Sequence, residues 1–265
     1  MPPIALQPPR SRRTLSRLTT SFREGLQIAG EGIAELLWPT RCVLCDVPGT
    51  LLCDECRLEI PYIDPLRACS YCGQAHGRYA CIDCNSFMVE HRELSTPSPL
   101  DRIASVFAFI DPCRKLVTTY KDRKEIRLAG VLAELIAAYI NPSWITPGQT
   151  ALVVIPARKQ AIRERGFDHM QQIGEHLAQF TGLPLLDALA PQERTDQRGL
   201  SAAHRQKNMR NSFILKPQPA STALPATIIL VDDVLTTGAT LTAAATVLKE
   251  AGARQVFALT LGRIP

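Results

Sequence analysis

Short apolar runs alternate with longer amphipathic stretches in the part of the chain that follows residue 100. The apolar runs predict strands over 103–109, 151–155, 183–186, 227–231 and 254–261. The amphipathic stretches predict helices over 116–120, 128–139, 168–180 and 239–251. Strands that alternate with helices are typical of a parallel sheet with helices on its faces. We therefore expect an α/β domain over 100–265, in which the polar stretch 190–213 forms a long functional loop.

The chain before residue 100 lacks this alternation. Residues 1–24 contain five arginines and reach their first acidic residue only at Glu24, so we expect a disordered basic tail. A solvated tail is the plainer interpretation, and attraction to nucleic acid or to a membrane surface is the alternative. Residues 28–38 predict a short amphipathic helix that ends before Pro39. With the cysteine-rich stretch that follows, this helix defines a small unit over 25–95.

The predicted strand 227–231 leads into the most informative segment of the sequence. Two adjacent carboxylates, Asp232 and Asp233, follow it, and the small, hydroxyl-rich turn 236–240 precedes the last predicted helix. Free backbone N–H groups and the helix dipole at such a helix start attract a phosphate. Gly238 allows a ligand to approach the backbone, and acidic oxygens beside a phosphate suit the hydroxyls of a ribose. The alternative is an ordinary turn in which an Asp and a Thr cap the helix.

Composition places the chain among globular proteins, with 46% hydrophobic and 21% charged residues. The net charge of +5 suits anionic ligands without requiring nucleic acid, and the few aromatic residues argue against a base-stacking surface. The apolar runs are too short to span a bilayer, so stable membrane insertion is not expected. The N-terminus lacks the apolar centre of a secretory signal, so we expect a cytoplasmic protein whose thiols stay reduced.

Eight of the nine cysteines form four Cys-X-X-Cys pairs within residues 42–84. This spacing allows both thiolates of a pair to bind one tetrahedral ion. Eight thiolates make two closed, structural four-cysteine sites, for which zinc is the simplest ion. Metal binding would supply the folding free energy of a unit too small to bury a core. The predicted zinc ligands are Cys42, Cys45, Cys53, Cys56, Cys69, Cys72, Cys81 and Cys84.

Several features of this unit stay open at the level of sequence. Disulfides or an iron–sulfur cluster are the alternatives to zinc. The two sites are either sequential, as 42/45/53/56 and 69/72/81/84, or interleaved, as 42/45/69/72 and 53/56/81/84. His76 and His91 are close enough in sequence to replace a cysteine ligand. Cys113 stands apart, and we expect it to be a small buried hydrophobic residue.

The segment 228–240 resembles the phosphoribosyl pyrophosphate (PRPP) motif of type I phosphoribosyltransferases. Three further features extend the similarity: 153–156 with 163–168, the stretch from Arg194 to Asn208, and Lys121. With the cysteine unit in front, the chain is similar to the ComF family over residues 38–263. That family joins a double zinc ribbon to a type I phosphoribosyltransferase domain of Rossmann-like fold, and it is associated with DNA uptake in natural competence.

Two short segments depart from the family pattern. Family members usually have Pro-Val-Pro-Leu-His after the second strand, whereas residues 155–159 are Ile-Pro-Ala-Arg-Lys. They usually have Arg-Gly-Phe-Asn-Gln where residues 165–169 are Arg-Gly-Phe-Asp-His. The first departure lies in a loop that faces pyrophosphate in the superfamily, so it concerns the handling of pyrophosphate and acceptor.

The resemblance implies a Mg²⁺-dependent transfer from PRPP to an acceptor that the sequence does not identify. Asp232 and Asp233 would bind the ribose hydroxyls and oppose positive charge on the ring, and with Arg194 they are the candidate catalytic residues. Mg²⁺ would bridge oxygens of the substrate. The loop 194–208 would close over the site and exclude water. The candidate PRPP-binding residues are Asp232, Asp233, Thr236, Thr237, Gly238, Ala239, Thr240, Lys121, Arg158 and Arg165.

His169 and His204 are candidate acid–base groups, although histidines in such loops are more often exposed.

A second function also stays open: a non-catalytic or PRPP-sensing accessory protein that binds single-stranded DNA through the zinc unit and the basic surface, as a partner of the DNA-uptake machinery. Stabilisation by PRPP and Mg²⁺ would support the enzyme, and salt-dependent binding to oligonucleotides alone would support the accessory protein.

Overall fold

A computed structural model describes residues 39–69, 71–76, 80, 81, 84, 98–192, 212–217 and 223–265. Several predicted features lie outside these residues: the basic tail, the helix over 28–38, most of the loop 190–213 with Arg194, His204 and Asn208, and His91.

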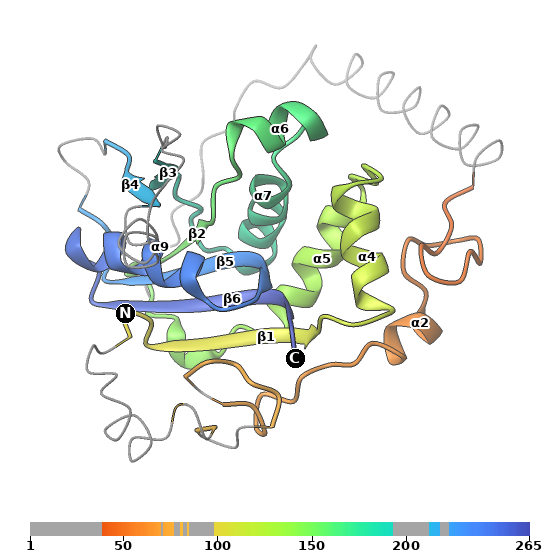
Figure 1. Ribbon diagram of the computed structural model, residues 1–265, viewed down its shortest axis with the longest axis horizontal. Helices are drawn as coiled ribbons and strands as arrows, with labels where there is room; N and C mark the ends of the chain where they lie inside the picture. The colour runs from red at the N-terminus through yellow and green to blue at the C-terminus, as the bar shows by residue number, and fades with distance from the viewer. Residues whose placement is uncertain are drawn as a thin grey trace, which may run out of the picture.

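Four parallel strands form the central sheet (Figure 1). In space they follow the order β1 (Arg102–Ala108), β6 (Gln255–Arg263), β5 (Thr227–Leu235) and β2 (Thr150–Val154). The two central strands, β6 and β5, are buried along most of their length, as expected where helices cover both faces of a parallel sheet. The strands predicted over 103–109, 151–155 and 254–261 are confirmed to within two residues.

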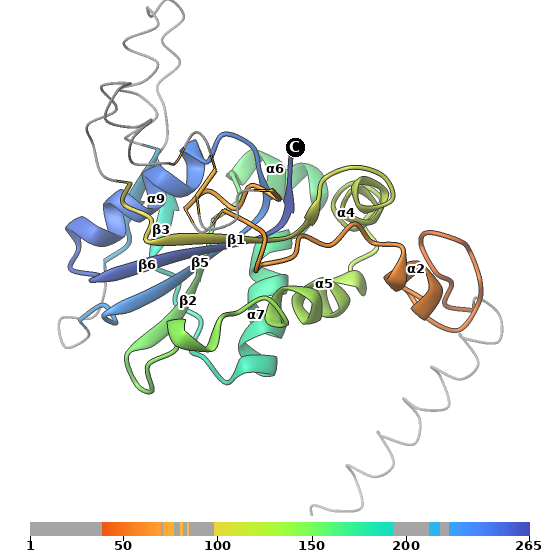
Figure 2. The same ribbon diagram turned by 90° about the horizontal axis from the view of Figure 1, so that it is seen from below.

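Helices enclose this sheet from both sides, as Figure 2 shows. On one face pack α5 (Leu128–Ala137) and α7 (His169–Thr181), with α4 (Cys113–Lys121) beside α5. On the opposite face packs α9 (Ala239–Glu250). Each face has its own buried apolar cluster, and the four predicted helices and the parallel α/β class are confirmed.

Other elements differ from the sequence-based expectation. Strand β5 runs on to Leu235 instead of ending at 231, because the residues after Val231 continue to pair with β6. The stretch 183–186 is not a separate strand, since Leu185 makes only a single parallel bridge to Leu152 at the edge of β2.

The two ends of the expected loop 190–213 pair with each other in a small antiparallel sheet of β3 (Leu189–Pro191) and β4 (Phe213–Leu215). The helix α6 (Lys159–Arg165) was not predicted, because seven residues without a buried side chain carry no apolar period. It ends at Gly166, which has a φ of 88° in the left-handed region that favours glycine.

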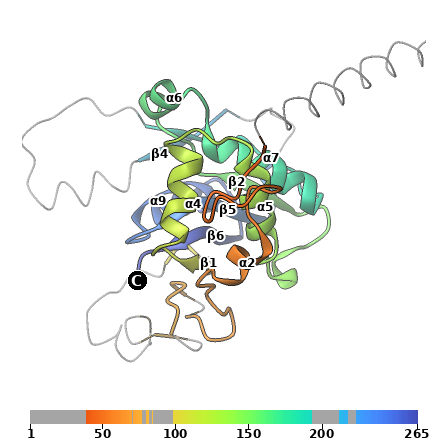
Figure 3. The same cartoon turned by 90° about the vertical axis from the view of Figure 1, so that its right-hand side faces the viewer.

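The cysteine segment packs against the sheet, as Figure 3 shows for α2 (Asp54–Leu58), which lies near α5. Residues 61–63 pair antiparallel with β1: the N–H of Ile63 donates to Val106 O at 2.9 Å, and that of Ala108 to Pro61 O at 3.0 Å. Several of its apolar residues belong to the same buried cluster as α4 and α5, namely Cys42, Leu52, Cys53, Cys56 and Ile60. The division into 25–95 and 100–265 stays a prediction, because the described parts of both share one core.

Candidate functional site

The turn after β5 has the features expected of a phosphate site. The strand carries Asp232 and Asp233 toward its carboxyl end, and α9 begins three residues after Thr236, at Ala239. Gly238 has a φ of 78°, so this position of the turn requires the left-handed conformation that glycine adopts without strain. The hydroxyl residues Thr236, Thr237 and Thr240 are exposed around the start of the helix. In parallel α/β sheets, ligands bind at this end of the strands.

The carboxylate of Asp233 is buried and fixed by two side chains. Lys121, the last residue of α4, donates from Nζ to Oδ2, and His169 Nε2 lies 2.8 Å from the same oxygen. Burial by itself would raise the pKa of Asp233, but the hydrogen bond from His169 and the charge of Lys121 outweigh it and lower the pKa below its usual range. Asp233 is therefore held ionised in one orientation.

His169 links this carboxylate to Arg165. Its Nδ1 lies 2.9 Å from Arg165 Nη1. A guanidinium only donates, so Nδ1 accepts, and Nε2 carries the proton that is donated to Asp233. His169 is only 6% exposed, unlike the exposed histidine that sequence reasoning favoured. Tyr120 O–H donates to the backbone oxygen of His169 at 2.6 Å and so fixes the start of α7.

The contacts at residues 168 and 169 are of kinds that Asn and Gln side chains can also make. A neutral imidazole that accepts at one nitrogen and donates at the other offers the same two functions as the carboxamide of the usual Gln. Asp168 caps α7, since its Oδ1 accepts from the N–H groups of Met170 and Gln171, both at 3.1 Å. An Asn side chain fills the same role.

Asp232 has a different environment from its neighbour. The side chain is half-buried, and Oδ1 accepts from the backbone N–H of Asp233 at 2.9 Å. Burial and the adjacent charge of Asp233 raise the pKa of Asp232 to about 8. Hydroxyl donors or a cation at this carboxylate would relieve that destabilisation, so Asp232 is the member of the pair that is suited to a ligand.

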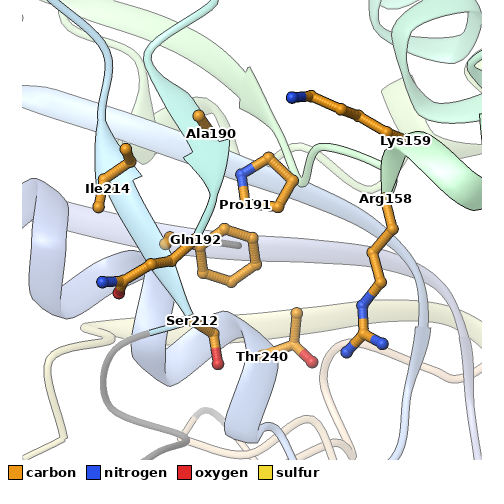
Figure 4. Close-up of a pocket in the computed structure, with 9 residues that line it drawn as sticks. Arg158, Lys159, Ala190, Pro191, Gln192, Ser212, Ile214 and Thr240 are labelled. Atoms are coloured by element: carbon orange, nitrogen blue, oxygen red, sulfur yellow. The ribbon is translucent and has the colours of Figure 1, made fainter. Parts of the chain in front are cut away.

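A cavity of about 840 Å³ opens beside the first residues of α9 (Figure 4). In Figure 4 the guanidinium of Arg158, at the start of α6, points toward the side of the cavity where Thr240 lies. Arg158 therefore approaches the N-terminus of α9, whereas the Lys159 side chain extends away from Thr240, and the sheet of β3 and β4 forms the opposite wall. The lining residues are Arg158, Lys159, Ala190, Pro191, Gln192, Ser212, Phe213, Ile214 and Thr240.

The candidate PRPP-binding residues divide into groups in space. Arg158 and Thr240 line the cavity of Figure 4, whereas Lys121 and Arg165 converge on the acidic pair through Asp233 and His169. Arg194 lies outside the described residues. Their roles toward PRPP stay predictions. The contact between His169 and Asp233 joins the start of α7 to β5, and the pattern within either segment carries no signal of it.

The cysteines form two compact groups in the sequential arrangement. The sulfurs of 42/45/53/56 all lie within 4.8 Å of one another, and so do those of 69/72/81/84. Four thiolates around a tetrahedral zinc ion lie about 3.8 Å apart, because each Zn–S bond is about 2.3 Å long. Each group therefore fits a zinc ion, and the interleaved pairing is excluded. All nine cysteines are free thiols in the structure, so it contains no disulfide among them.

The remaining thiol, Cys113, is fully buried at the start of α4, as expected. Burial raises its pKa to about 12, so this thiol is protonated at neutral pH.

Several curated proteins are similar to the chain over most of its length. Competence protein F of Haemophilus influenzae is 25% identical over 238 residues, which are 84% of this chain and 96% of that protein. Competence protein ComFC of Bacillus subtilis is 28% identical over 258 residues, or 89% and 98% of the two chains. The DNA utilization protein YhgH of Escherichia coli is 26% identical over 225 residues, or 79% and 95%.

Two further comparisons add little. No protein-family model matches the chain. A crystal structure of adenine phosphoribosyltransferase from Leishmania tarentolae superposes on 68% of this chain and 88% of its own, with 14% identity and a TM-score of only 0.30.

Within the described residues, no helix combines the length and apolar character needed to cross a membrane. Two four-cysteine groups in front of a parallel α/β sheet, together with near full-length similarity to competence protein F, ComFC and YhgH, support the similarity of the chain to the ComF family.

Proposed function

We propose that this protein binds PRPP with Mg²⁺ and transfers its phosphoribosyl group to an acceptor. The observation that carries the proposal is the position of Asp232 and Asp233 on a central parallel strand, directly before the turn 236–240 and the start of α9. This arrangement brings acidic acceptors for ribose hydroxyls next to a helix N-terminus that attracts phosphate.

The two carboxylates would act differently on the ribose. Asp232 is half-buried and accepts from a backbone N–H, so it has remaining acceptor capacity for the hydroxyl groups. Asp233 is held by Lys121 and His169, and its charge opposes the positive charge that develops on the ring as the bond to pyrophosphate breaks. Because its orientation is fixed before substrate arrives, this stabilisation requires no reorganisation.

The phosphate groups of PRPP would occupy two places along the same turn. The exposed N–H groups and hydroxyls of 236–240 suit the 5′-phosphate. Arg158 and Lys159 border the cavity of about 840 Å³ beside Thr240 and suit the pyrophosphate, because a guanidinium binds phosphate oxygens in pairs.

The acidic residues fit Mg²⁺ that is bound mainly through substrate and water. Asp232 offers oxygen ligands, whereas Oδ2 of Asp233 is already engaged by two donors, so the pair does not form a complete cage for the ion. Mg²⁺ would supply neutralisation of charge on the leaving pyrophosphate.

Binding of PRPP gives the direct test. Calorimetric titration with PRPP and Mg²⁺ should yield saturable binding to the wild type, and thermal unfolding should shift upward. Asp232→Asn and Asp233→Asn should weaken binding by at least about tenfold, since each removes a charged hydrogen-bonding partner. The matched control is Asp187→Asn, at a 70% exposed carboxylate that pairs with Lys216. Equal affinity in all four proteins, or no binding to the wild type, would contradict the proposal.

A role in DNA handling is the second candidate, and the names of the curated relatives favour it. In this case the zinc unit and the basic surface would bind single-stranded DNA with or without catalysis. Binding of a labelled oligothymidylate should then fall steeply between low and physiological salt. Such binding without any response to PRPP would favour the accessory protein over the enzyme.

A further inference from the structure

Arg165 and His169 meet across the short turn between α6 and α7. They are four residues apart in the sequence but belong to different helices, because Arg165 ends α6 and His169 begins α7. Gly166 ends α6 in the left-handed conformation, and Phe167 packs edge-on against Tyr120 with ring centroids 5.6 Å apart. The hydrogen bond from Tyr120 to the backbone oxygen of His169 fixes the first residue of α7. The turn therefore brings the guanidinium to the imidazole, with 2.9 Å between Arg165 Nη1 and His169 Nδ1.

This contact is made by hydrogen bonding and not by core packing. No side chain of α6 is buried, and Arg165 itself is half-buried, whereas the His169 side chain is only 7% exposed. Loss of the guanidinium would therefore leave the apolar core unchanged and remove a donor from Nδ1. The charged groups that contact the other side of this network are Asp233 on β5 and, through Asp233, Lys121 on α4.

The position of the proton on His169 decides how Asp233 is held. Burial by itself would raise the pKa of Asp233, and the hydrogen bond from His169 is the largest of the causes that lower it. His169 can donate this bond only when Nε2 carries the proton, and a neutral imidazole has one proton for its two nitrogens. A guanidinium cannot accept a hydrogen bond, so its contact with Nδ1 leaves the proton on Nε2.

We infer that Arg165 is a positioning residue that acts on PRPP through His169 and Asp233, and is not itself a ligand of a phosphate group. The inference rests on the proposed function. By donating to Nδ1, Arg165 keeps His169 as a donor to Asp233, and this bond keeps the carboxylate in one orientation for the ribose. The described residues that line the cavity beside Thr240 include Arg158 but not Arg165. The two arginines at opposite ends of α6 thus have different tasks toward the same substrate.

The protonation form of the imidazole gives a test that does not require PRPP. Nitrogen-15 spectra at neutral pH should show a single form of His169 in the wild type, protonated at Nε2 only, with the signals identified by their loss in His169→Gln. Arg165→Met should give a mixture of forms in which Nδ1 also holds a proton, because Nδ1 has lost its donor. Arg165→Lys should restore the single form, since an ammonium group also only donates. The matched control is Arg163→Met, at an exposed arginine in the same turn of α6, and should leave the spectrum unchanged.

Affinity measurements separate an indirect role of Arg165 from a direct one. Arg165→Met should weaken binding of PRPP with Mg²⁺ by at least about fivefold and leave the affinity for pyrophosphate alone within about twofold of the wild type. Arg158→Met should weaken the binding of both. In a His169→Leu background, Arg165→Met should have no further effect on PRPP affinity, because the residue through which it acts is missing.

Three results would count against these roles. A spectrum of His169 that Arg165→Met does not change, or losses of PRPP affinity that add in the double variant, would overturn the inference and leave the proposed function intact. A wild type that binds no PRPP would instead refute the proposed function, and the inference with it.

Discussion

At the scale of single residues, the two neighbouring carboxylates differ in their pKa. Asp233 is held ionised, whereas the raised pKa of Asp232 can change when a ligand binds. Asp233 points to Lys121 and His169, which hold its pKa low, whereas Asp232 accepts only a backbone N–H among the described contacts. The sequence predicted the pair but not this division, because the division depends on α4 and α7 meeting β5. The local sequence pattern shows which residues are neighbours along the chain, but it contains no information on which residues from α4 and α7 meet β5 in the folded protein.

Replacement of His169 tests whether the imidazole acts through its two hydrogen bonds. His169→Leu should lower the free energy of unfolding by about 1.5–3 kcal/mol, because a buried carboxylate loses a donor. His169→Gln should retain most of the stability and the PRPP affinity, since its carboxamide also accepts and donates. Urea denaturation measures the stability of each variant, and PRPP titration measures its affinity. Equal losses in the two variants would show that ring packing, not hydrogen bonding, is what matters.

The raised pKa of Asp232 predicts a pH dependence of stability in the ligand-free protein. Its folded value of about 8 lies above the unfolded value of about 3.9, so between these pH values only the folded state keeps the proton. Its contribution is therefore present at low pH and is lost as pH rises toward 8, with a slope of at most about 1.4 kcal/mol per pH unit.

Asp232→Asn removes this titration. The free energy of unfolding of the variant, compared with the wild type at pH 5.5 and at pH 8, should become relatively more favourable at the higher pH. The same substitution should weaken PRPP binding, so stability at pH 8 and binding would change in opposite directions. A difference between the two proteins that does not vary with pH would contradict the environment described for Asp232.

At the scale of elements, the longer helices and strands were predictable because each buries one or two apolar faces with a regular period. The shorter elements were not. The helix α6 has no buried residue, and the strands β3 and β4 have three residues each, too few to show alternation. The end of β5 was misplaced because acidic residues usually end an apolar run, whereas here they continue the strand next to β6.

The contact between α7 and β2 depends on the absence of a side chain at Gly174. A Cβ there would lie 2.6 Å from Val154 Cγ1, so Gly174→Ala should destabilise the protein by about 1–3 kcal/mol through overpacking. Gly130 of α5 is a matched helical control, because its Cβ would meet only His176, at 3.8 Å. Gly130→Ala should stabilise by up to about 1 kcal/mol. Denaturant midpoints that move in the same direction would contradict this packing.

Metal content tests the sequential grouping of the cysteines. The wild type should contain two zinc ions per chain by elemental analysis, one for each four-cysteine group. The double variant Cys45→Ser/Cys56→Ser should lose one ion, because both sulfurs belong to the same group. The double variant Cys45→Ser/Cys72→Ser should lose both. An interleaved arrangement predicts the opposite for these two variants, and iron in place of zinc would refute the assignment of the metal.

At the scale of the whole molecule, the cysteine segment is part of the core. Cys42, Cys53 and Cys56 are buried together with residues of α4 and α5, and Arg57 pairs with Glu134 of α5 at 2.9 Å. The sequence suggested two units because the alternation of strands and helices begins only after residue 100, and such a pattern does not show which surfaces pack together. The family resemblance supplied the order of the two parts but not their contact.

Shared burial predicts that the metal sites and the α/β sheet unfold together. Scanning calorimetry of the zinc-loaded protein should give one transition, and a chelator should lower the temperature of that whole transition. An independently folded cysteine unit would instead give a separate transition, and the chelator would abolish only that one.

The hydrogen bonds of residues 61–63 to β1 have a further consequence for self-association. A parallel sheet ends in two strands whose outer N–H and C=O groups can recruit strands from other molecules. Here Ile63 and Ala108 engage that edge of β1, and at the other edge Leu152 N–H donates to Pro184 O at 2.8 Å and its oxygen accepts from Leu186 N–H at 2.8 Å. Both borders of the sheet are thereby occupied from within the chain. Residues 61–63, which pair with the outer edge of β1, lie between the two metal groups in the sequence. Loss of zinc would therefore release this segment and expose the backbone N–H and C=O groups of β1. The first sign of metal depletion should be aggregation rather than a soluble unfolded chain.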